Sequence, residues 1–294
     1  MKKKNQIRPR RSFIFTPPFK SEMFQKVLSS NVDIVCLELE DGVHPNEKES
    51  ARNAVIKNIN KNNTSTSVEI LIRINSIREK FGIEDILALL NSNKQPDGIM
   101  MPKVRTPDEI LILDNLLEEA GKNTKLHIII ETNEGLKNVY DIAACSDKIE
   151  TLFFGGVDMS AELRCKNMWE ALLYARSRIV NAAAANHLDV IDVPFLDLKD
   201  MKTMKLEAKK SKDLGFTGKG TIHPKQIDII NKVFTPSNTD ISKAKRIINE
   251  FEKSNKGLLV VDGKLIEKPV LRDMYRIIKI GDKIKDKKKN NILY

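Results

Sequence analysis

Short apolar runs rich in β-branched residues alternate along the chain with longer segments whose apolar positions follow a helical period. Strands are predicted near eight of these runs, at residues 13–15, 33–37, 70–73, 98–101, 127–130, 151–154, 190–192 and 220–222. Helices are predicted between them, for example over residues 109–120, 169–186 and 205–213. This alternation is typical of β–α units that surround a parallel sheet buried on both faces.

Eight strand–helix units over 294 residues predict an α/β fold, a (β/α)8 TIM barrel. The alternative is an open doubly wound sheet, but no Gly-x-Gly-x-x-Gly pattern follows the first predicted strand. The rhythm then stops, so we assign a catalytic barrel to residues 1–236 and a lid or oligomerisation extension to residues 237–294. The extension is expected to hold a helix over 241–253, a hairpin around 261–264 and a helix after Pro269. Because it is too small for a core of its own, it must pack on the barrel or on another subunit.

Composition indicates a folded protein of the cell interior. A hydrophobic content of 41% over 294 residues is enough for a sizeable buried core. No run of about 18 apolar residues is present, and the opening Met-Lys-Lys-Lys-Asn-Gln is not followed by an apolar signal core. The three cysteines form neither a Cys-x-x-Cys pair nor an even disulfide framework. We therefore expect a cytoplasmic protein without a membrane partner.

The formal net charge of +10 raises the question of nucleic-acid binding, because clustered Lys and Arg side chains neutralise phosphates. Here the lysines are spread along the chain, the dense clusters are terminal, at residues 2–4 and 283–289, and aromatic residues make up only 5%. A solvated basic face is therefore favoured over a nucleic-acid partner. The positive field can still attract an anionic substrate.

Two acids close neighbouring predicted strands, Glu131 after the fifth and Asp158 after the sixth. The active site of a TIM barrel lies at the carboxyl ends of its strands, so these carboxylates are expected to converge above the barrel. Mg²⁺ is commonly bound through one or two carboxylates, with waters and substrate oxygens completing its shell. The alternative is that each acid caps the helix that follows it. Their position on adjacent strands favours the metal site.

Charged residues also close the second, third and fourth predicted strands. Arg73 directly follows an apolar run and needs an anionic partner to offset its desolvation. That partner is either a substrate carboxylate, gripped bidentately, or a structural ion pair with Glu40 or Asp41. Glu40 and Asp41 are predicted to accept hydrogen bonds from metal-bound waters, and they can also balance Arg73 and Lys103.

The four histidines have no metal-ligand spacing, and no Ser-His-Asp, Cys-His or Gly-x-Ser-x-Gly set is apparent. His127 lies in a predicted strand and His187 at a helix end, so both are interpreted as structural. His223 closes the eighth strand after the small residues of Gly218-Lys219-Gly220, which permit a ligand to approach closely. A phosphate or adenine contact at His223 is one hypothesis, and a structural role is the other.

Taken in order, these strand ends resemble the citrate lyase β-subunit-like branch of the HpcH/HpaI aldolase superfamily. The resemblance covers nearly the whole chain and rests on the order and spacing of Arg10-Arg11-Ser12, Glu40-Asp41, Arg73-Ile74-Asn75, Pro102-Lys103, Glu131-Thr132-Asn133-Glu134-Gly135, Asp158, Tyr174-Ala175-Arg176-Ser177, Gly215-Phe216-Thr217-Gly218-Lys219, Ile222-His223-Pro224 and Phe234-Thr235-Pro236-Ser237.

This resemblance implies a homotrimeric or hexameric barrel in which Glu131 and Asp158 bind Mg²⁺. It also implies that Arg73 grips the carboxylate of a keto acid and that coenzyme A crosses the barrel mouth. Four further matching residues join Arg73 as substrate-binding candidates, namely Glu131, Lys103, Arg11 and His223.

The resemblance further implies that the extension carries an acid, within a Gly-Lys-Met-Ile-Asp motif, into a neighbouring subunit's active site as a lid. Here the motif reads Gly263-Lys264-Leu265-Ile266-Glu267, with Glu in place of Asp. The extra methylene moves the carboxylate, and positioning errors of about 1 Å can cost roughly 10²-fold in rate. Glu267 is counted as a catalytic candidate together with Arg73, Glu40 and Asp41.

The implied activity is Mg²⁺-dependent cleavage or formation of a 3-hydroxyacyl-CoA thioester of the malyl-, citramalyl- or citryl-CoA type, giving a 2-keto acid and an acyl-CoA. The runner-up is a class II pyruvate-type aldolase of the same superfamily, which needs no CoA. That branch typically places a His where Asp41 stands here. The third hypothesis is a CoA- or keto-acid-binding homologue without catalysis. The sequence leaves open the acyl group and whether CoA or an acyl carrier protein bears it.

Overall fold

The structure is a computed structural model that describes residues 8–61, 67–254 and 258–292. The lysine cluster at residues 2–4 lies outside these ranges. The described residues divide into two compact units, one within 10–231 and the other within 232–292 together with Arg8 and Pro9.

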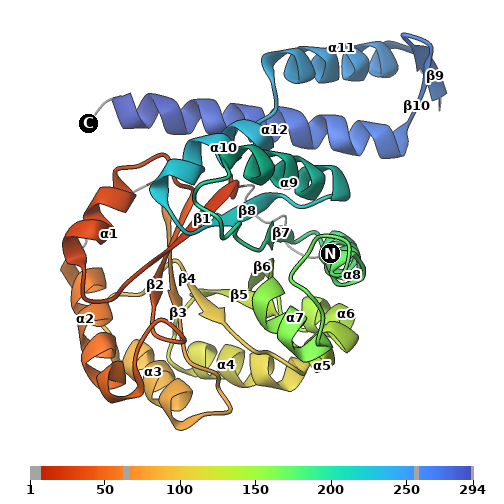
Figure 1. Cartoon of the computed structure of the whole chain (residues 1–294). Coiled ribbons are helices and arrows are strands. Elements are labelled where there is room, and N and C mark those ends of the chain that lie inside the picture. The colour runs from red at the N-terminus through yellow and green to blue at the C-terminus, as the bar shows by residue number, and fades with distance from the viewer. Residues whose placement is uncertain (1–7, 62–66, 255–257, 293–294) are drawn as a thin grey trace. The chain divides into compact units, whose positions relative to one another are not determined.

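The first unit is a closed barrel of eight parallel strands, in which each strand pairs with the next (Figure 1). Closure is given by β1, which pairs with both β2 and β8: Ile14 lies opposite Val35 on one side and Thr221 on the other. All eight predicted strands and the predicted barrel are confirmed, and the open-sheet alternative is excluded. The strands are β1 (Ser12–Thr16), β2 (Ile34–Glu38), β3 (Glu69–Arg73), β4 (Gly98–Met101), β5 (Lys125–Ile130), β6 (Ile149–Phe154), β7 (Asp189–Asp192) and β8 (Gly218–Thr221).

Helices follow the strands and surround the barrel (Figure 1). The predicted segments correspond to α4, α8 and α9, although α8 begins four residues later than predicted. The helices of this part of the chain are α1 (Ser21–Leu28), α2 (Lys48–Lys61), α3 (Lys80–Asn91), α4 (Pro107–Glu119), α5 (Asn133–Lys137), α6 (Val139–Ala144), α7 (Gly156–Leu163), α8 (Leu173–Ala185), α9 (Met201–Leu214) and α10 (Ile227–Phe234), with 3-10 turns η1 (Pro45–Glu47) and η2 (Pro224–Gln226).

Apolar side chains fill the inside of the barrel, as a packed TIM barrel requires. Strands β1 to β7 each contribute to one buried cluster, which consists of Phe13, Ile34, Cys36, Leu71, Met100, Ile129, Phe153 and Ile191. Phe13 and Phe153 meet edge to face with ring centroids 4.9 Å apart. All three cysteines are free.

Buried ion pairs close the amino-terminal end of the barrel. Arg10 binds Glu69 with Nε 2.7 Å from Oε2, and its Nη1 lies 3.0 Å from Asp189 and 3.3 Å from Glu150. Burial disfavours the charge, but Glu69, Asp189 and Glu150 together outweigh it and raise the pKa of Arg10. Three acids from different strands are therefore matched by one planar cation.

The second unit contains α11 (Asn238–Ser254), a hairpin of β9 (Leu258–Val261) and β10 (Lys264–Glu267), and α12 (Lys268–Ile292). The predicted helix, hairpin and following helix are thus confirmed. The expectation that the extension is too small for a core of its own is wrong, because Ile247, Ile248, Val261, Ile266 and Leu271 form a small apolar core within this unit. Among the described residues of the chain, no helix is long and apolar enough to cross a membrane.

Candidate active site

Charged side chains gather at the carboxyl ends of five consecutive strands. Glu38 is the last residue of β2 and Arg73 the last of β3, whereas Lys103 lies in the loop after β4. Glu131 directly follows β5, and Asp158 lies in the first turn of α7, after β6. Because the strands are parallel, all five residues belong to the same rim, where TIM barrels place their chemistry.

Arg73 is a partly buried cation of this rim. Its Nη2 lies 2.6 Å from Oε2 of Glu38, and its Nη1 lies 2.9 Å from Oε2 of Glu40. The guanidinium also stacks on Phe15, with Cζ 4.4 Å from the ring centroid. Burial opposes the charge, but the fields of Glu38 and Glu40 outweigh it and raise the pKa of Arg73. Arg73 is therefore a fixed positive charge with an aromatic support.

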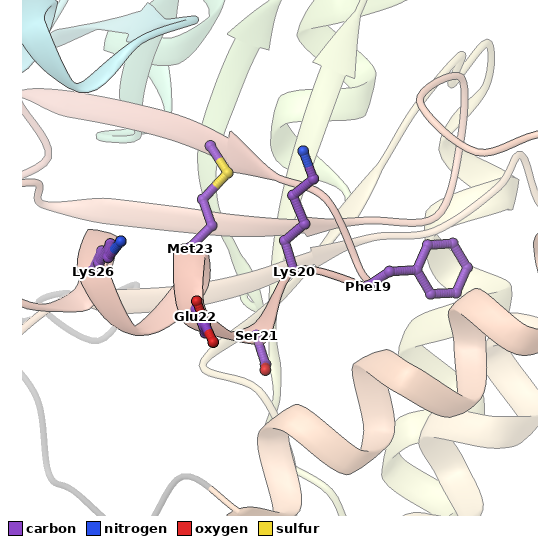
Figure 2. A pocket seen from close by; sticks show the side chains of 6 residues that line it. All are labelled: Phe19, Lys20, Ser21, Glu22, Met23 and Lys26. Carbon is purple, nitrogen blue, oxygen red and sulfur yellow. The ribbon is translucent and has the colours of Figure 1, made fainter.

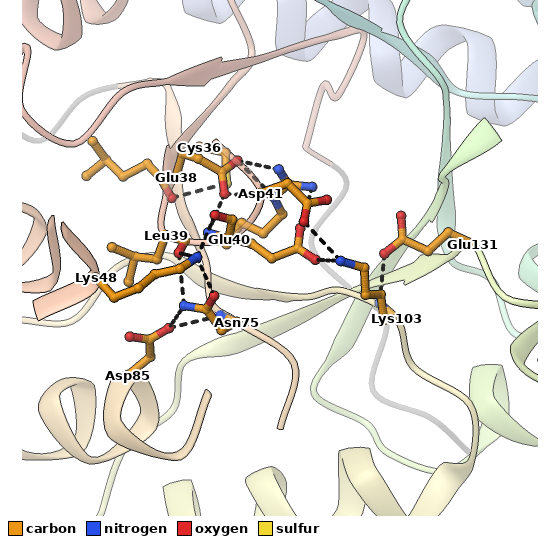
Figure 3. Close-up of polar contacts among 12 residues, drawn as sticks. Cys36, Glu38, Leu39, Glu40, Asp41, Lys48, Asn75, Asp85, Lys103 and Glu131 are labelled. Atoms are coloured by element: carbon orange, nitrogen blue, oxygen red, sulfur yellow. Dashed lines mark hydrogen bonds and ion pairs between the residues drawn. The ribbon is translucent and has the colours of Figure 1, made fainter. Parts of the chain in front are cut away.

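Glu40 links Arg73 to Lys103. Its Oε1 lies 2.5 Å from Nζ of Lys103, which also lies 3.0 Å from Oδ1 of Asp41 (Figure 3). Burial raises the pKa of Glu40, although the positive charge of Arg73 opposes this shift. Of the two ion pairs considered for Arg73, the pair with Glu40 is present, and the more exposed Asp41 pairs with Lys103 instead.

Glu131 has no such cation. Its side chain is 3% exposed. Within the described chain it accepts one hydrogen bond, 2.8 Å from the backbone N–H of Lys103 to Oε1, and has no ion pair. Lys103 has a φ of 53°, in the left-handed region that residues with a side chain rarely adopt. Burial and the negative charges of Glu40 and Asp158 raise the pKa of Glu131 to about 8.

This setting suits a divalent cation. A Cβ on Gly155 would lie 2.4 Å from Oε2 of Glu131, so glycine leaves the space that the carboxylate occupies. A hard cation would neutralise Glu131 and Asp158 together through oxygen ligands. No group of three or more His, Cys, Asp or Glu residues in the described ranges is arranged to hold a metal. A Mg²⁺ ion bound by these two carboxylates would therefore rely on waters and substrate oxygens for the rest of its shell.

The helix-capping alternative fits the two acids differently. Thr132, and not Glu131, caps α5: its hydroxyl accepts a hydrogen bond of 3.0 Å from the N–H of Gly135. Asp158 lies in the first turn of α7, where a negative charge is favoured by the helix dipole. Capping therefore does not account for Glu131, whereas it can account for part of the role of Asp158.

Two residues of this rim, Glu38 and Lys48, are not among the site residues predicted from the sequence. Glu38 pairs with Arg73, and its only signal is an acid that alternates with Glu40 at a strand end. Lys48, at the start of α2, donates from Nζ to the carbonyl oxygens of Leu39 and Glu40 and to Oδ1 of Asn75. A lysine at a helix start reads as a surface residue, so the sequence gives no sign of its burial.

The remaining predicted site residues have other settings. Arg11 precedes β1 at the amino-terminal end of the barrel and binds Asp33, with Nε 2.7 Å from Oδ2. Arg11 therefore forms a structural ion pair at the amino-terminal end of the barrel. It does not lie on the rim that holds Glu131, Lys103 and Arg73. His223 follows β8 and caps η2, because its Nδ1 accepts a hydrogen bond from Lys225. Glu267 closes β10 in the second unit with an exposed side chain.

A hollow of about 450 Å³ lies beside the loop that joins β1 to α1 (Figure 2). Its lining consists of Phe19, Lys20, Ser21, Glu22, Met23 and Lys26. A second hollow of about 210 Å³ shares Phe19 and reaches Lys57 and Lys61 of α2. None of the four lysines has an ion-pair partner among the described residues. The two hollows therefore form a basic surface with an exposed aromatic ring.

Comparison with known proteins places this geometry in a family. Residues 11–224 match the family model for HpcH/HpaI aldolase/citrate lyase. The chain belongs to the HpcH/HpaI aldolase/citrate lyase family. It is 30% identical over 298 residues to a citramalyl-CoA lyase, mitochondrial, of Homo sapiens, an alignment that covers 95% of this chain and 87% of that protein. The resemblance predicted from the strand-end motifs is thus confirmed.

Two solved structures are similar to this chain. RipC from Yersinia pestis is 37% identical, covers 79% of this chain and 97% of its own, and has a TM-score of 0.69. The citrate lyase β subunit of M. tuberculosis, complexed with oxaloacetate and magnesium, is 26% identical, covers 78% of this chain and 97% of its own, and has a TM-score of 0.66. The HpcH/HpaI family therefore includes CoA-ester lyases and citrate lyase β subunits that resemble this chain in fold and sequence.

Proposed function

We propose that this member of the HpcH/HpaI family is a Mg²⁺-dependent carbon–carbon lyase for a 3-hydroxyacyl-CoA thioester of the malyl-, citramalyl- or citryl-CoA type. One observation carries the proposal. Glu131 is a buried carboxylate that has no ion pair among the described residues and feels the negative charges of Glu40 and Asp158, on the rim that also holds Arg73. The citramalyl-CoA lyase relative and the oxaloacetate- and magnesium-bound structure support the same reaction class.

Glu131 and Asp158 are the residues that would hold the metal. When bound there, Mg²⁺ supplies Lewis-acid polarisation of the substrate oxygen that becomes the ketone. Arg73 would bind the carboxylate of the keto-acid half, because its guanidinium is charged, partly buried and held by Glu38 and Glu40. Lys103 holds Glu131 through its backbone N–H and Glu40 through Nζ, so it ties the metal-binding acid to the arginine.

Cleavage requires the hydroxyl of the substrate to lose its proton and the departing thioester carbon to gain one. Glu40 pairs with both Arg73 and Lys103, and Asp41 pairs with Lys103. We assign these two acids to orient water and accept the hydroxyl proton. The bond between the two carbon atoms then breaks, and its electron pair leaves on the thioester as an enolate. Glu267 is the acid proposed to protonate that enolate, as a lid residue.

The basic hollow supports a CoA ester as the substrate. The nucleotide end of coenzyme A is polyanionic and ends in a flat purine, whereas this surface offers Lys20, Lys26 and the half-exposed ring of Phe19. It lies at the loop after β1, and therefore on the same rim as Arg73. We propose that the phosphates bind here, and that His223 contacts the ligand from the end of β8.

Subunit association and location complete the proposal. The outer face of the hairpin exposes Leu258, Val260 and Leu265 beside Glu267. Apolar side chains gathered around one acid suit a surface that packs against another protein. We propose a homotrimer or hexamer in the cytoplasm, in which this hairpin serves as a lid on a neighbouring subunit.

A thioester panel tests the function directly. The purified protein is incubated with malyl-CoA, citramalyl-CoA and citryl-CoA, with Mg²⁺ or with EDTA, and the release of acyl-CoA and keto acid is measured. Mg²⁺-dependent cleavage of at least one thioester is expected. Condensation of pyruvate with aldehydes in the absence of CoA would replace the lyase by the aldolase. Binding of the thioesters without turnover would make the protein a non-catalytic homologue.

A further inference from the structure

We infer that Lys48 is a positioning residue, which fixes the loop after β2 so that Glu40 meets both Arg73 and Lys103. The inference rests on the proposed lyase function for its effect on turnover, and on the hydrogen bonds of Lys48 for its effect on the loop. Lys48 itself contacts none of the residues assigned to hold the metal or to grip the keto acid. It acts through the backbone of Leu39 and Glu40.

The ammonium group of Lys48 is fully used. It donates to the carbonyl oxygen of Leu39 at 2.8 Å, to that of Glu40 at 2.7 Å and to Oδ1 of Asn75 at 2.6 Å (Figure 3). An ammonium has three protons, so each one has an acceptor. The residue is 7% exposed, and burying a charge at this depth is costly without such partners. Burial accordingly lowers the pKa of Lys48.

The acceptor Asn75 is itself held from behind. Its Nδ2 donates to the carbonyl of Leu39 at 2.9 Å and to Oδ2 of Asp85 at 2.7 Å. Asp85 is 1% exposed, and its other oxygen binds Nε of Arg52 at 2.8 Å. This chain of buried polar contacts joins α2 and α3 to the loop after β2. Lys48 is its last member before the site.

The loop that Lys48 clamps determines where Glu40 lies. The N–H of Leu39 binds the carbonyl of Arg73 at 3.0 Å, and the N–H of Glu40 binds Oε1 of Glu38 at 2.5 Å. Lys48 donates hydrogen bonds to the carbonyl oxygens of the same residues, Leu39 and Glu40. Glu40 then places one carboxylate oxygen on Arg73 and the other on Lys103. Loss of the clamp should therefore displace Glu40 and, through it, both cations.

The test compares Lys48→Met with Lys122→Met, a matched control. Lys122 also donates from Nζ to a backbone carbonyl, that of Ser92 at 3.0 Å, but lies away from the carboxyl-end rim, in the segment between α4 and β5. We expect kcat of Lys48→Met to fall by about 10²-fold, the typical cost of a displacement of about 1 Å. Affinity for pyruvate with Mg²⁺, measured by calorimetry, should weaken by about tenfold, whereas Lys122→Met should change each value by less than about twofold.

The calorimetric affinity already separates positioning from partial unfolding. It does not change when a fraction of the protein is unfolded, because only the apparent number of sites falls. Hydrogen exchange and the variant Lys48→Arg add two further readouts. Hydrogen exchange of the peptide spanning residues 38–44 should speed up by about tenfold in Lys48→Met and stay unchanged in Lys122→Met. Lys48→Arg keeps the charge but not the three-oxygen geometry, so its kcat should also fall below that of the wild type.

Wild-type turnover and exchange in Lys48→Met, or wild-type turnover in Lys48→Arg, would overturn the inference. Failure of the proposed function looks different: the unmodified protein would cleave no thioester, while the exchange measurement would still report whether Lys48 holds the loop.

Discussion

The two ends of the barrel bury charge in opposite ways. At the amino-terminal end, Arg10 lies within ion-pair distance of Glu69, Glu150 and Asp189. At the carboxyl end, Glu131 is buried as deeply, yet its only polar contact among the described residues is the backbone N–H of Lys103. Buried charges are tolerated when they are paired, and an unpaired one is costly. The matched set therefore serves the fold, and the unmatched carboxylate marks the place where a cation is expected to bind.

Replacing one acid at each end of the barrel should separate the catalytic role from the structural one, and the largest expected effect is the loss of turnover at the carboxyl end. Glu131→Gln should reduce Mg²⁺-dependent turnover by about 10³-fold or more, because a bound metal contributes several kcal/mol to the transition state. Asp158→Asn should act in the same direction. Glu150→Gln, at the amino-terminal end, should leave turnover within about twofold of the wild type. Turnover at several Mg²⁺ concentrations, with circular dichroism as the check of folding, measures the contrast.

Full activity in Glu131→Gln and Asp158→Asn would contradict this contrast between the two ends, since catalysis would then not require a metal bound by these acids. An inactive but folded Glu150→Gln would also contradict it.

The converse change should damage stability and spare chemistry. Arg10→Met removes the guanidinium that binds buried Glu69 at 2.7 Å, and removing one partner of a buried ion pair typically costs about 3–5 kcal/mol. Urea unfolding measures this loss, and kcat per folded molecule should stay unchanged. Lys125→Met is the control, because its ion pair with Glu150 is long, at 3.7 Å, and partly exposed. It should cost less than about 1 kcal/mol. An equal loss in both variants would show that the Arg10 cluster is not the stabilising element.

The barrel could be predicted because each strand leaves a local mark. An apolar, β-branched run that is buried on both faces differs in composition from the helices around it, and eight such runs have one common closed solution. The start of α8 was predicted too early, at 169 instead of Leu173, because the apolar pattern continues into the turn before it. Helix ends are set by hydrogen bonds that periodicity does not report.

The place of a residue on the carboxyl-end rim could be predicted only where its position relative to its strand decides it. Arg73 ends β3, Glu131 directly follows β5, and Asp158 lies in the first turn of the helix after β6, so topology alone puts them on one rim. Lys48 depends instead on the path of the loop after β2, and no pattern of neighbours in the sequence encodes that path. Arg11 differs from the expectation of a substrate-binding residue. It precedes β1, so the same topology places it at the amino-terminal end of the barrel, where it binds Asp33. The family motif that contains Arg11 does not report at which end of the barrel the residue lies.

The smallest expected effect follows from the raised pKa of Glu131. Its pKa rises from 4.5 to about 8 in the folded protein, so ionising it disfavours the fold. The contribution of Glu131 to the stability of the metal-free protein should therefore be most favourable below pH 4.5 and should decline as the pH rises towards 8. Glu131→Gln cannot ionise, and every other titrating group is shared with the wild type.

The Tm of Glu131→Gln minus that of the wild type, measured in EDTA, should therefore grow by at least about 2 °C between about pH 5 and about pH 8.5, since 1 kcal/mol shifts Tm by roughly 2–4 °C at this size. Adding Mg²⁺ at the higher pH should close the gap, because a cation restores the missing partner of the carboxylate and stabilises only the wild type. A gap that stays constant with pH would mean that Glu131 is solvated or paired in solution, and the contrast between the two ends of the barrel would lose its basis.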